Sequence, residues 1–464
     1  MSRKPVLPLI LSCWMVISFG CHRSKPAEFT PFFAAFYNRA LTDQDVAWQQ
    51  LSDLCRRYPR RLCGSEAAQG AVQYTLELMR RMDLDRAYLQ EVMVKHWQRQ
   101  PVEQALLQGA RSQDRTIPIC SLGGSVGTGP EGIRGKILEV EGLAELEQLS
   151  PPQVAGRVVF FNQAMNPTRL NTFRAYGEAV PQRIDGASAA GRRGAVAVLV
   201  RSVTNALDDF PHTGVMHYQS GVPRIPAVAI STLEAERLSR RLSSGEEVSI
   251  RFTTRCIQHP EKISHNVIGE ITGSRYPDQI ITVGGHLDCW DNSPGAHDDG
   301  GGCIQAIQVL SLFKACGIRP RHTLRAVMFM DEEVAQRGGL AYAREALGNG
   351  ERHVAALESD RGVFTPRALG VSDGKIGFNR VKKYQHLFTP YHIAIIPGGG
   401  GVDIGPLKNG FPKITLMSLI PDDARYFDFH HSAADTPDQV HPREMQLGTA
   451  AMACLVYLVD RLAD

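Results

Sequence analysis

Cysteine is sparse in this chain, and its spacing excludes two common kinds of structural site. Ten cysteines are spread over 464 residues, too few for a scaffold held together by disulfides. No two of them form a CxxC pair, which excludes the usual thiolate zinc site. Cys55 and Cys63 are close enough in sequence to pair in an oxidising compartment, and their pairing stays open.

A strong excess of charge of either sign is also absent. The 51 basic residues nearly balance the 48 acidic ones, for a net charge of +3. This small and dispersed charge argues against a nucleic acid or a membrane surface as partner. The apolar fraction of 43% is ordinary for a soluble globular protein. A length of 464 residues favours two domains over one.

Long apolar runs are missing except at the N-terminus, between residues 6 and 20. Two basic residues precede this run, which has the length of a signal-peptide core and is too short to span a membrane. The following Cys21 resembles the processing site of a bacterial lipoprotein. We expect residues 1–21 to be a signal peptide, with either a lipid anchor at Cys21 or ordinary cleavage nearby. The predicted location is the periplasm or cell envelope as a lipoprotein, or alternatively secretion.

Strands alternate with helices along most of the chain. In the second half we expect strands at 280–283, 323–330, 354–357 and 414–420, and helices at 301–315 and 445–462. In the first half we expect helices at 42–58 and 65–82, a strand at 87–97, and a compact α/β module from 119 to 255. This alternation favours an α/β fold with a mixed, mostly parallel sheet and helices on both faces.

Histidines and carboxylates occur in one order along the second half. They lie in the segments GGHLDCWDNSPGAHDDGGG, FMDEEVAQRGG, ALESDRG and FHHSAADTPD, and the residues of interest are His286, Asp298, Glu332, Glu333, Asp360 and His431. Most of them follow the end of a predicted strand, which is where ligands gather in open parallel sheets. The set can supply ligands to a pair of metal ions and leave one carboxylate as a base.

This residue set indicates metal-assisted hydrolysis of an acyl bond. Two ions can share one water and one carboxylate, and Asp298 is the candidate for the shared carboxylate. Glu332 and Glu333 are adjacent, so on extended backbone one can bind metal while the other faces the water as general base. Asp288, two residues after His286, can accept a hydrogen bond from the second imidazole nitrogen. Imidazole and carboxylate ligands suit zinc.

The same four segments resemble the co-catalytic di-zinc metallopeptidase family that includes zinc aminopeptidases and glutamate carboxypeptidases. The resemblance extends to NVIGEITGSRYPDQI, HTGVMHYQSGVPRIPAVAIS and YPRRLCGSE, and covers nearly the whole mature chain. It implies a zinc exopeptidase fold formed by residues 22–118 and 256–464. Residues 119–255 resemble the protease-associated domain that this family carries as an insertion. The family also implies a homodimer.

Carried over by position, the resemblance implies two zinc ions that share one carboxylate ligand. These are His286 and Asp360 for one ion, Glu333 and His431 for the other, and Asp298 as the bridge between them. Glu332 would be the general base for a water that bridges the metals. The Asp298–Asp299 peptide in such sites is often cis. The expected substrates are short peptides, dipeptides with free termini above all, because the inserted domain would cap the cleft.

Two residue roles and several functions stay open. His430 replaces a tyrosine of some relatives and either donates a hydrogen bond to the substrate carbonyl or packs structurally. Asp403 either recognises a free α-amine or orders a zinc ligand. The alternatives to a dipeptidase are an aminopeptidase of broader specificity, a one-zinc enzyme like glutaminyl cyclase, and a binding protein without catalysis on the same fold.

Overall fold

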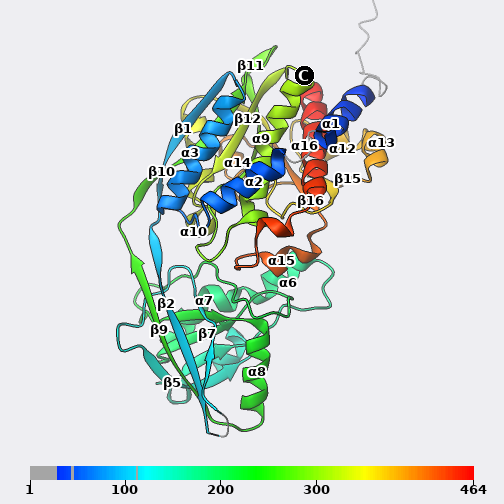
Figure 1. Ribbon diagram of the computed structural model, residues 1–464. Helices are drawn as coiled ribbons and strands as arrows, with labels where there is room; N and C mark the ends of the chain where they lie inside the picture. The colour runs from blue at the N-terminus through cyan, green and yellow to red at the C-terminus, as the bar shows by residue number, and fades with distance from the viewer. Residues whose placement is uncertain (1–28, 43–45, 111–112, 464) are drawn as a thin grey trace, which may run out of the picture.

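The computed structural model describes residues 29–42, 46–110 and 113–463, which form two lobes (Figure 1). Each lobe is built around one eight-stranded mixed sheet. The upper lobe comprises the described residues between 29 and 94 and those from 259 to 463, and the lower lobe comprises those between 97 and 258 (Figure 1). This mixed α/β architecture confirms the fold class predicted from the sequence.

The upper sheet has the strand order β1-β10-β12-β11-β13-β16-β14-β15. The bounds are Arg86–Val94 (β1), Lys262–Ile271 (β10), Tyr276–His286 (β11), His322–Phe329 (β12), Arg352–Glu358 (β13), Pro366–Val371 (β14), Ala394–Pro397 (β15) and Thr415–Pro421 (β16). The four central strands β12, β11, β13 and β16 are mutually parallel. Their carboxyl ends therefore lie along one edge of the sheet, where open α/β folds place their ligands.

Helices pack against the upper sheet and enclose its core. They are Thr30–Thr42 (α1), Val46–Arg57 (α2), Glu66–Arg81 (α3), Gly301–Ala315 (α9), Glu332–Ala335 (α10), Arg337–Gly348 (α11), Phe378–Lys382 (α12), Gln385–Phe388 (α13), Leu407–Gly410 (α14), Tyr426–Phe429 (α15) and Pro442–Leu462 (α16). Helix α9 is apolar nearly all round and lies against α16 in the largest hydrophobic cluster. A helix of this composition is stable only when it is buried on all sides.

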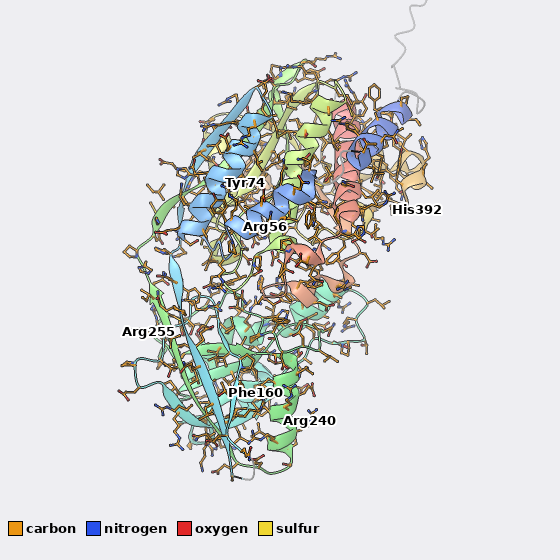
Figure 2. All side chains as sticks on the ribbon, in the orientation of Figure 1. Arg56, Tyr74, Phe160, Arg240, Arg255 and His392 are labelled. Carbon is orange, nitrogen blue, oxygen red and sulfur yellow. The ribbon has the colours of Figure 1, made fainter. Side chains whose placement is uncertain are left out.

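The lower sheet has the strand order β3-β2-β9-β5-β6-β7-β8-β4. Its strands are Trp97–Gly109 (β2), Arg115–Ile117 (β3), Cys120–Ser121 (β4), Ile133–Val140 (β5), Val158–Phe161 (β6), Ala197–Arg201 (β7), Ala227–Ile230 (β8) and Val248–Gln258 (β9). Its helices are Leu143–Gln148 (α4), Pro151–Val154 (α5), Thr172–Ala179 (α6), Pro181–Gly191 (α7) and Thr232–Ser243 (α8). Figure 2 shows Phe160 of β6 inside this lobe, where it is fully buried.

An aromatic cluster joins the two lobes. Phe173 and Tyr176 belong to α6 of the lower lobe, and Tyr426 and Phe427 belong to α15 of the upper lobe. Phe173 stacks on Tyr426 with ring centroids 5.5 Å apart, and Tyr176 stacks on Phe427 at 4.5 Å. Such pairs add stabilisation beyond the area that they bury. The lower lobe is thereby held close to the segment that follows β16, as the labels α6 and α15 show in Figure 1.

The structure confirms the helix predicted at 301–315 and the four strands predicted in the second half, with bounds shifted by a few residues. Helix α1 and strands β10, β14 and β15 were not predicted. Strand β10 contains Asn266, Gly269 and other residues that are rare in strands, so its composition hid it. The lower sheet also contains β2, which lies before the predicted start of the inserted domain at residue 119.

The structure bears differently on the predicted signal peptide, on the cysteines and on membrane crossing. The signal peptide of residues 1–21, with its lipid anchor at Cys21, lies outside the described residues. Cys55 and Cys63 are both free thiols, so they do not pair with each other. Within the described parts of the chain, we find no helix with the length and apolar character that crossing a membrane requires.

Candidate active site

Segments that are far apart in sequence meet at the carboxyl edge of the upper sheet. His286 is the last residue of β11, and Glu332 and Glu333 open helix α10 shortly after β12. Asp360 follows the end of β13, and His431 follows helix α15, beyond β16. Because the central strands are parallel, these positions share one edge of the sheet. The fold therefore brings the predicted ligands together.

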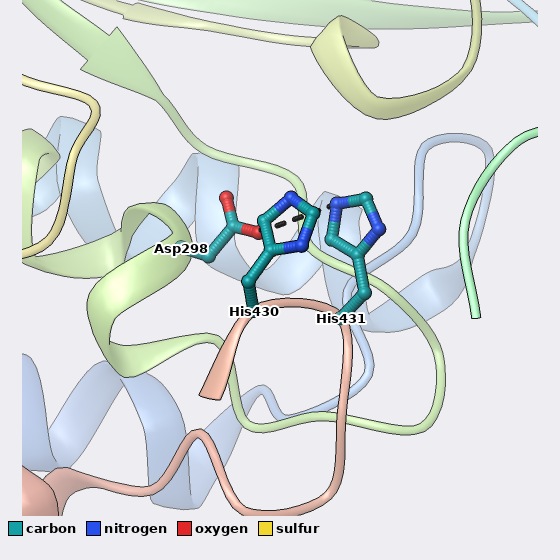
Figure 3. Close-up of side chains that lie close together, drawn as sticks. All are labelled: Asp298, His430 and His431. Atoms are coloured by element: carbon teal, nitrogen blue, oxygen red, sulfur yellow. Dashed lines mark ion pairs between the residues drawn. The ribbon is translucent and has the colours of Figure 1, made fainter. Parts of the chain in front are cut away.

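Asp298 lies between two histidines, and each of its carboxylate oxygens faces one of them. Its Oδ1 is 3.2 Å from His286 Nε2, and its Oδ2 is 3.4 Å from His431 Nε2. Asp360 Oδ1 lies 3.4 Å from the same nitrogen of His286, and Glu333 Oε2 lies 3.0 Å from that of His431. Dashed lines in Figure 3 mark the contacts of Asp298 with His431 and its neighbouring histidine. The arrangement is two small clusters that share one carboxylate.

These side chains have the donor atoms that a metal ion needs and lack the positive charge that it would bring. Asp298 Oδ2, Glu333 Oε1 and Asp360 Oδ1 are buried and accept no hydrogen bond from the described residues. Ligand atoms of His286, Asp298 and Glu333 lie within 4.8 Å of one another. Carboxylates this close repel each other unless a cation or a proton neutralises them. Nitrogen and oxygen donors of this kind fit zinc.

Sequence comparison assigns the chain to a family. The family described as Peptidase family M28 matches residues 266–456, the part that carries all these side chains. The chain is 34% identical to carboxypeptidase Q of Homo sapiens over 432 residues, which cover 93% of this chain and 88% of that protein. Carboxypeptidase Q of Bos taurus is 33% identical over 91% of this chain and 86% of its own length. The chain belongs to peptidase family M28.

Solved structures agree with this assignment. The Peptidase M28 precursor of Shewanella amazonensis superposes with a TM-score of 0.88 at 27% identity, over 94% of this chain and 97% of that one. A zinc aminopeptidase from Bacillus subtilis has the same fold, with a TM-score of 0.63 at 19% identity over 89% of this chain and 94% of its own. The protein is therefore a metallo-exopeptidase, as its sequence predicted.

Glu332 and Glu333 of this M28 peptidase differ in exposure although they are neighbours. Glu333 is buried and faces His431, whereas Glu332 is half-buried and lines the large pocket at the site. Burial raises the pKa of Glu332 well above its usual value, and the carboxylates of Asp360 and Asp288 raise it further. A carboxyl group with a raised pKa can hold a proton near neutral pH.

The pKa values of the histidines in the site are shifted in opposite directions. Burial alone would lower the pKa of His286, but the carboxylates of Asp360 and Asp298 outweigh it and raise the pKa well above its usual value. Burial, with His430 beside it, lowers the pKa of His431 well below its usual value. Burial likewise lowers the pKa of His430 to about 3. His431 and His430 are therefore neutral imidazoles, the form that binds metals or donates one hydrogen bond.

Buried groups that the sequence reasoning missed hold the ligand loops in place. Asp435 accepts hydrogen bonds from the main-chain N–H of His297 and of Asp298, at 2.7 and 3.1 Å. Asp299, which follows Asp298 across a cis peptide, accepts from the N–H of His286 at 3.1 Å. These acceptors fix the backbone on both sides of the candidate metal ligands. Asp435 lies in the motif HHSAADT, which the sequence analysis quoted only for its histidines.

The three residues that were predicted to support the site, Asp288, His430 and Asp403, differ in their contacts. As predicted, Asp288 accepts a hydrogen bond from His286 Nδ1; the acceptor is its main-chain carbonyl at 3.0 Å, and its carboxylate lies 3.9 Å away. His430 lines the pocket and stacks on His431 with ring centroids 3.4 Å apart. Asp403 is 1% exposed, its carboxylate accepts no hydrogen bond from the described residues, and it does not line the pocket.

The pocket over the site has a volume of about 1070 Å³ and lies between the lobes. Its floor contains the metal-binding candidates and Glu332, and residues of both lobes form its walls. From the lower lobe come Tyr176, Arg183, Met216, His217, Tyr218 and Arg224. Four of them lie in the segment HTGVMHYQSGVPRIPAVAIS, which was quoted for its family resemblance and was not assigned to the site. They reach the site only through the packing of one lobe on the other.

Proposed function

We propose that this M28 peptidase is a two-zinc exopeptidase that hydrolyses short peptides, with dipeptides that have free termini as its main substrates. The observation that carries the proposal is the position of Asp298, whose two oxygens face the histidines of two separate ligand clusters. His286 and Asp360 would hold one ion, and Glu333 and His431 the other. Zinc ions bound there would lower the pKa of a water molecule and polarise the scissile carbonyl.

Glu332 is the general base in this proposal. It lines the pocket next to the ligand Glu333, and its main-chain N–H donates to Asp288 Oδ1 at 3.2 Å, which orients the start of α10. Its carboxylate takes a proton from the attacking water, and that proton then passes to the nitrogen of the leaving amine. One water is consumed, the C–N bond breaks, and a carboxylate and an amine are released.

The lower lobe supports the restriction to short substrates. It covers the side of the pocket opposite the sheet with α6 and α7, and the aromatic stacks of α6 on α15 keep it there. His430 is a neutral imidazole at the pocket wall and can donate a hydrogen bond to the substrate carbonyl as negative charge develops on it.

The test of the base is a Glu332→Gln variant. We expect turnover to fall about 10²–10⁴-fold, the usual contribution of a general base, while the zinc content stays at the wild-type value. Glu77→Gln, an exposed position on α3, makes the same chemical change away from the site and should have no effect. Wild-type turnover in Glu332→Gln would refute its role, and loss of zinc would make it a ligand instead.

The test of the substrate class uses one dipeptide in three forms, with free ends, with a blocked amine and with a blocked carboxylate, each with and without added zinc. Cleavage of the free dipeptide alone supports a dipeptidase. Cleavage of the carboxyl-blocked form as well would make the enzyme an aminopeptidase of broader specificity. Zinc content per chain adds a second criterion, since two ions support the proposal, one favours a cyclase-like site and none a binding protein.

A further inference from the structure

Arg183 places a buried positive charge in the wall of the active-site pocket. It lies on helix α7 of the lower lobe, is 5% exposed, and lines the same pocket as His286, Asp298 and Glu332. Burying a guanidinium group is costly unless its charge and its N–H groups find partners. The partners of Arg183 therefore indicate what it is there to bind.

The described residues leave Arg183 incompletely paired. Its Nη1 donates to the carbonyl of Thr213 at 3.3 Å, and its guanidinium lies 5.5 Å from the ring centre of Tyr176. Its Nε is buried and has no hydrogen-bond partner there. Among the described residues, none places a carboxylate within ion-pair distance of this guanidinium. The positive charge faces the pocket without a protein anion to balance it.

Other buried arginines of the described chain differ from Arg183 in how their charge and their N–H groups are paired. Arg99 pairs with Asp291 at 2.7 Å, and Arg325 pairs with Glu270 at 2.8 Å. Arg61 has no carboxylate partner, but its Nε, Nη1 and Nη2 each donate to a main-chain carbonyl. Arg99 and Arg201 also leave Nε without a hydrogen-bond partner, but each forms an ion pair with a carboxylate. Arg183 has an unused donor and no carboxylate partner among the described residues, and it lines the active-site pocket.

The other cations of the pocket wall are less suited to bind an anion. Lys95 forms an ion pair with Glu261 at 2.9 Å, and Arg224 is exposed beside the ring of Tyr218. A planar guanidinium fork matches a carboxylate better than an ammonium group does, because it can donate two parallel hydrogen bonds. Arg183 is therefore the best candidate for an anionic part of the substrate.

One carbonyl links Arg183 to the catalytic cluster. The oxygen of Thr213 lies 3.3 Å from Arg183 Nη1 and 3.3 Å from His431 Nδ1. Gly214 packs so closely that a Cβ there would lie 2.4 Å from the guanidinium carbon, so the side chain has little freedom to swing away. One residue of extended peptide spans about 3.3–3.6 Å. Arg183 therefore lies within two hydrogen-bond lengths of the His431 imidazole, and this closeness favours contact with the residue next to the scissile bond.

We propose that Arg183 binds the α-carboxylate of the residue on the C-terminal side of the scissile bond, and that it makes a free carboxylate at this position the main requirement of the enzyme. This inference rests on the proposed exopeptidase function and deepens it. A tripeptide would carry its carboxylate one residue too far away, and a dipeptide amide would carry no negative charge at its C-terminus. The lower lobe then determines which substrate length the enzyme accepts.

The experiment measures kcat/KM of zinc-loaded enzyme on one dipeptide, its C-terminal amide and a tripeptide that extends it. We expect wild type to prefer the free dipeptide over the amide by about 10–100-fold, the value of one charge-assisted hydrogen-bond pair. Arg183→Met should lose that factor on the free dipeptide, mainly through KM, and change the amide by less than about twofold. Arg183→Lys should fall in between, and Arg240→Met, at an exposed position on α8 outside the pocket, should behave as wild type.

Two results would overturn the inference and leave the proposed function standing. One is an equal loss on the dipeptide and its amide in Arg183→Met, which would mean that Arg183 acts only through Thr213 and His431. The other is wild-type enzyme that cleaves the amide as fast as the free dipeptide, a result that needs no variant to fold. If zinc-loaded wild type cleaved none of the three substrates, the proposed function itself would fail.

Discussion

Single residues of the site are stable only through their neighbours. Asp298 has two histidines facing its oxygens, and its backbone is held by Asp435. Each of these groups is buried, so none can rely on water for its hydrogen bonds. The polar groups around the metal cluster therefore form a network in which the loss of one member leaves another without a partner. Arg61 is one member on which three main-chain carbonyls depend.

Arg61 holds the loop between β11 and Asp298. Its guanidinium donates to the carbonyls of Leu287, Pro294 and Gly295, and the side chain is fully buried. Replacing it by methionine keeps much of the volume and leaves three carbonyls without donors. We expect the free energy of unfolding to fall by about 3 kcal/mol or more, as measured by urea denaturation, together with weaker zinc binding.

The matched control for this prediction is Arg60→Met, a change at the neighbouring exposed arginine. It removes the same positive charge and should leave both the urea midpoint and the zinc affinity at the wild-type values. Equal stability of Arg61→Met and wild type would show that water satisfies these carbonyls and that the loop does not depend on the guanidinium.

At the scale of elements, the contact of α9 with the loop after β13 sets the position of Asp360. Gly302, in the first turn of α9, has no room for a side chain, since a Cβ there would lie 2.0 Å from the carbonyl oxygen of Ser359 and 2.4 Å from Asp299 Oδ1. Ser359 directly precedes Asp360. The close approach of helix and loop is therefore possible only with glycine, and it brings the Asp360 carboxylate to the cluster.

A Gly302→Ala variant tests this contact. The added methyl group must push the loop away from α9, so we expect a loss of about 1–3 kcal/mol in stability and at least a tenfold weaker affinity for zinc. Gly177→Ala, inside α6 with nothing within 4 Å of the new methyl, should instead be neutral or slightly stabilising. The measurements are urea denaturation and competition for zinc with a chelator. An unchanged zinc affinity in Gly302→Ala would contradict the argument.

For the whole molecule, we expect metal binding and folding to be coupled. The upper sheet buries several carboxylates at one edge, and the lower lobe covers them. Without cations these charges repel one another and favour opening of the edge, whereas bound ions stabilise the folded state alone. The two lobes and the metal site therefore belong to one cooperative unit, connected by β2, β9 and the aromatic cluster of α6 and α15.

Removal of metal should therefore lower the melting temperature. At a zinc concentration about a thousandfold above the dissociation constant, bound zinc contributes about 4 kcal/mol to stability. We expect calorimetry to show a lower Tm after chelation and recovery when zinc is returned. A His431→Ala variant, which lacks one ligand, should respond more weakly to both steps. Identical melting curves with and without chelator would mean that the site does not bind metal in the folded protein.

The candidate site residues and their order could be read from the sequence, and so could the strands that present them; the structure brings these side chains together. Apolar runs such as those of β11, β12 and β13 mark buried strands, because a strand covered on both faces needs apolar residues along its whole length. A polar residue directly after such a run lies at a sheet edge in any parallel α/β fold. This is why His286, Glu333 and Asp360 could be placed near one another before their distances were known.

Only the tertiary structure decided which groups support and limit the site. Asp435 and Arg61 act through contacts between segments that are more than a hundred residues apart, and Arg183 lines one pocket with residues at such a separation. No periodicity along the chain reports this proximity. Asp288 does accept the predicted hydrogen bond from His286, but only the folded backbone decided that its carbonyl oxygen is the acceptor, with its carboxylate 3.9 Å away. Sequence determined the chemistry of this enzyme, and packing of the two lobes determined what surrounds it.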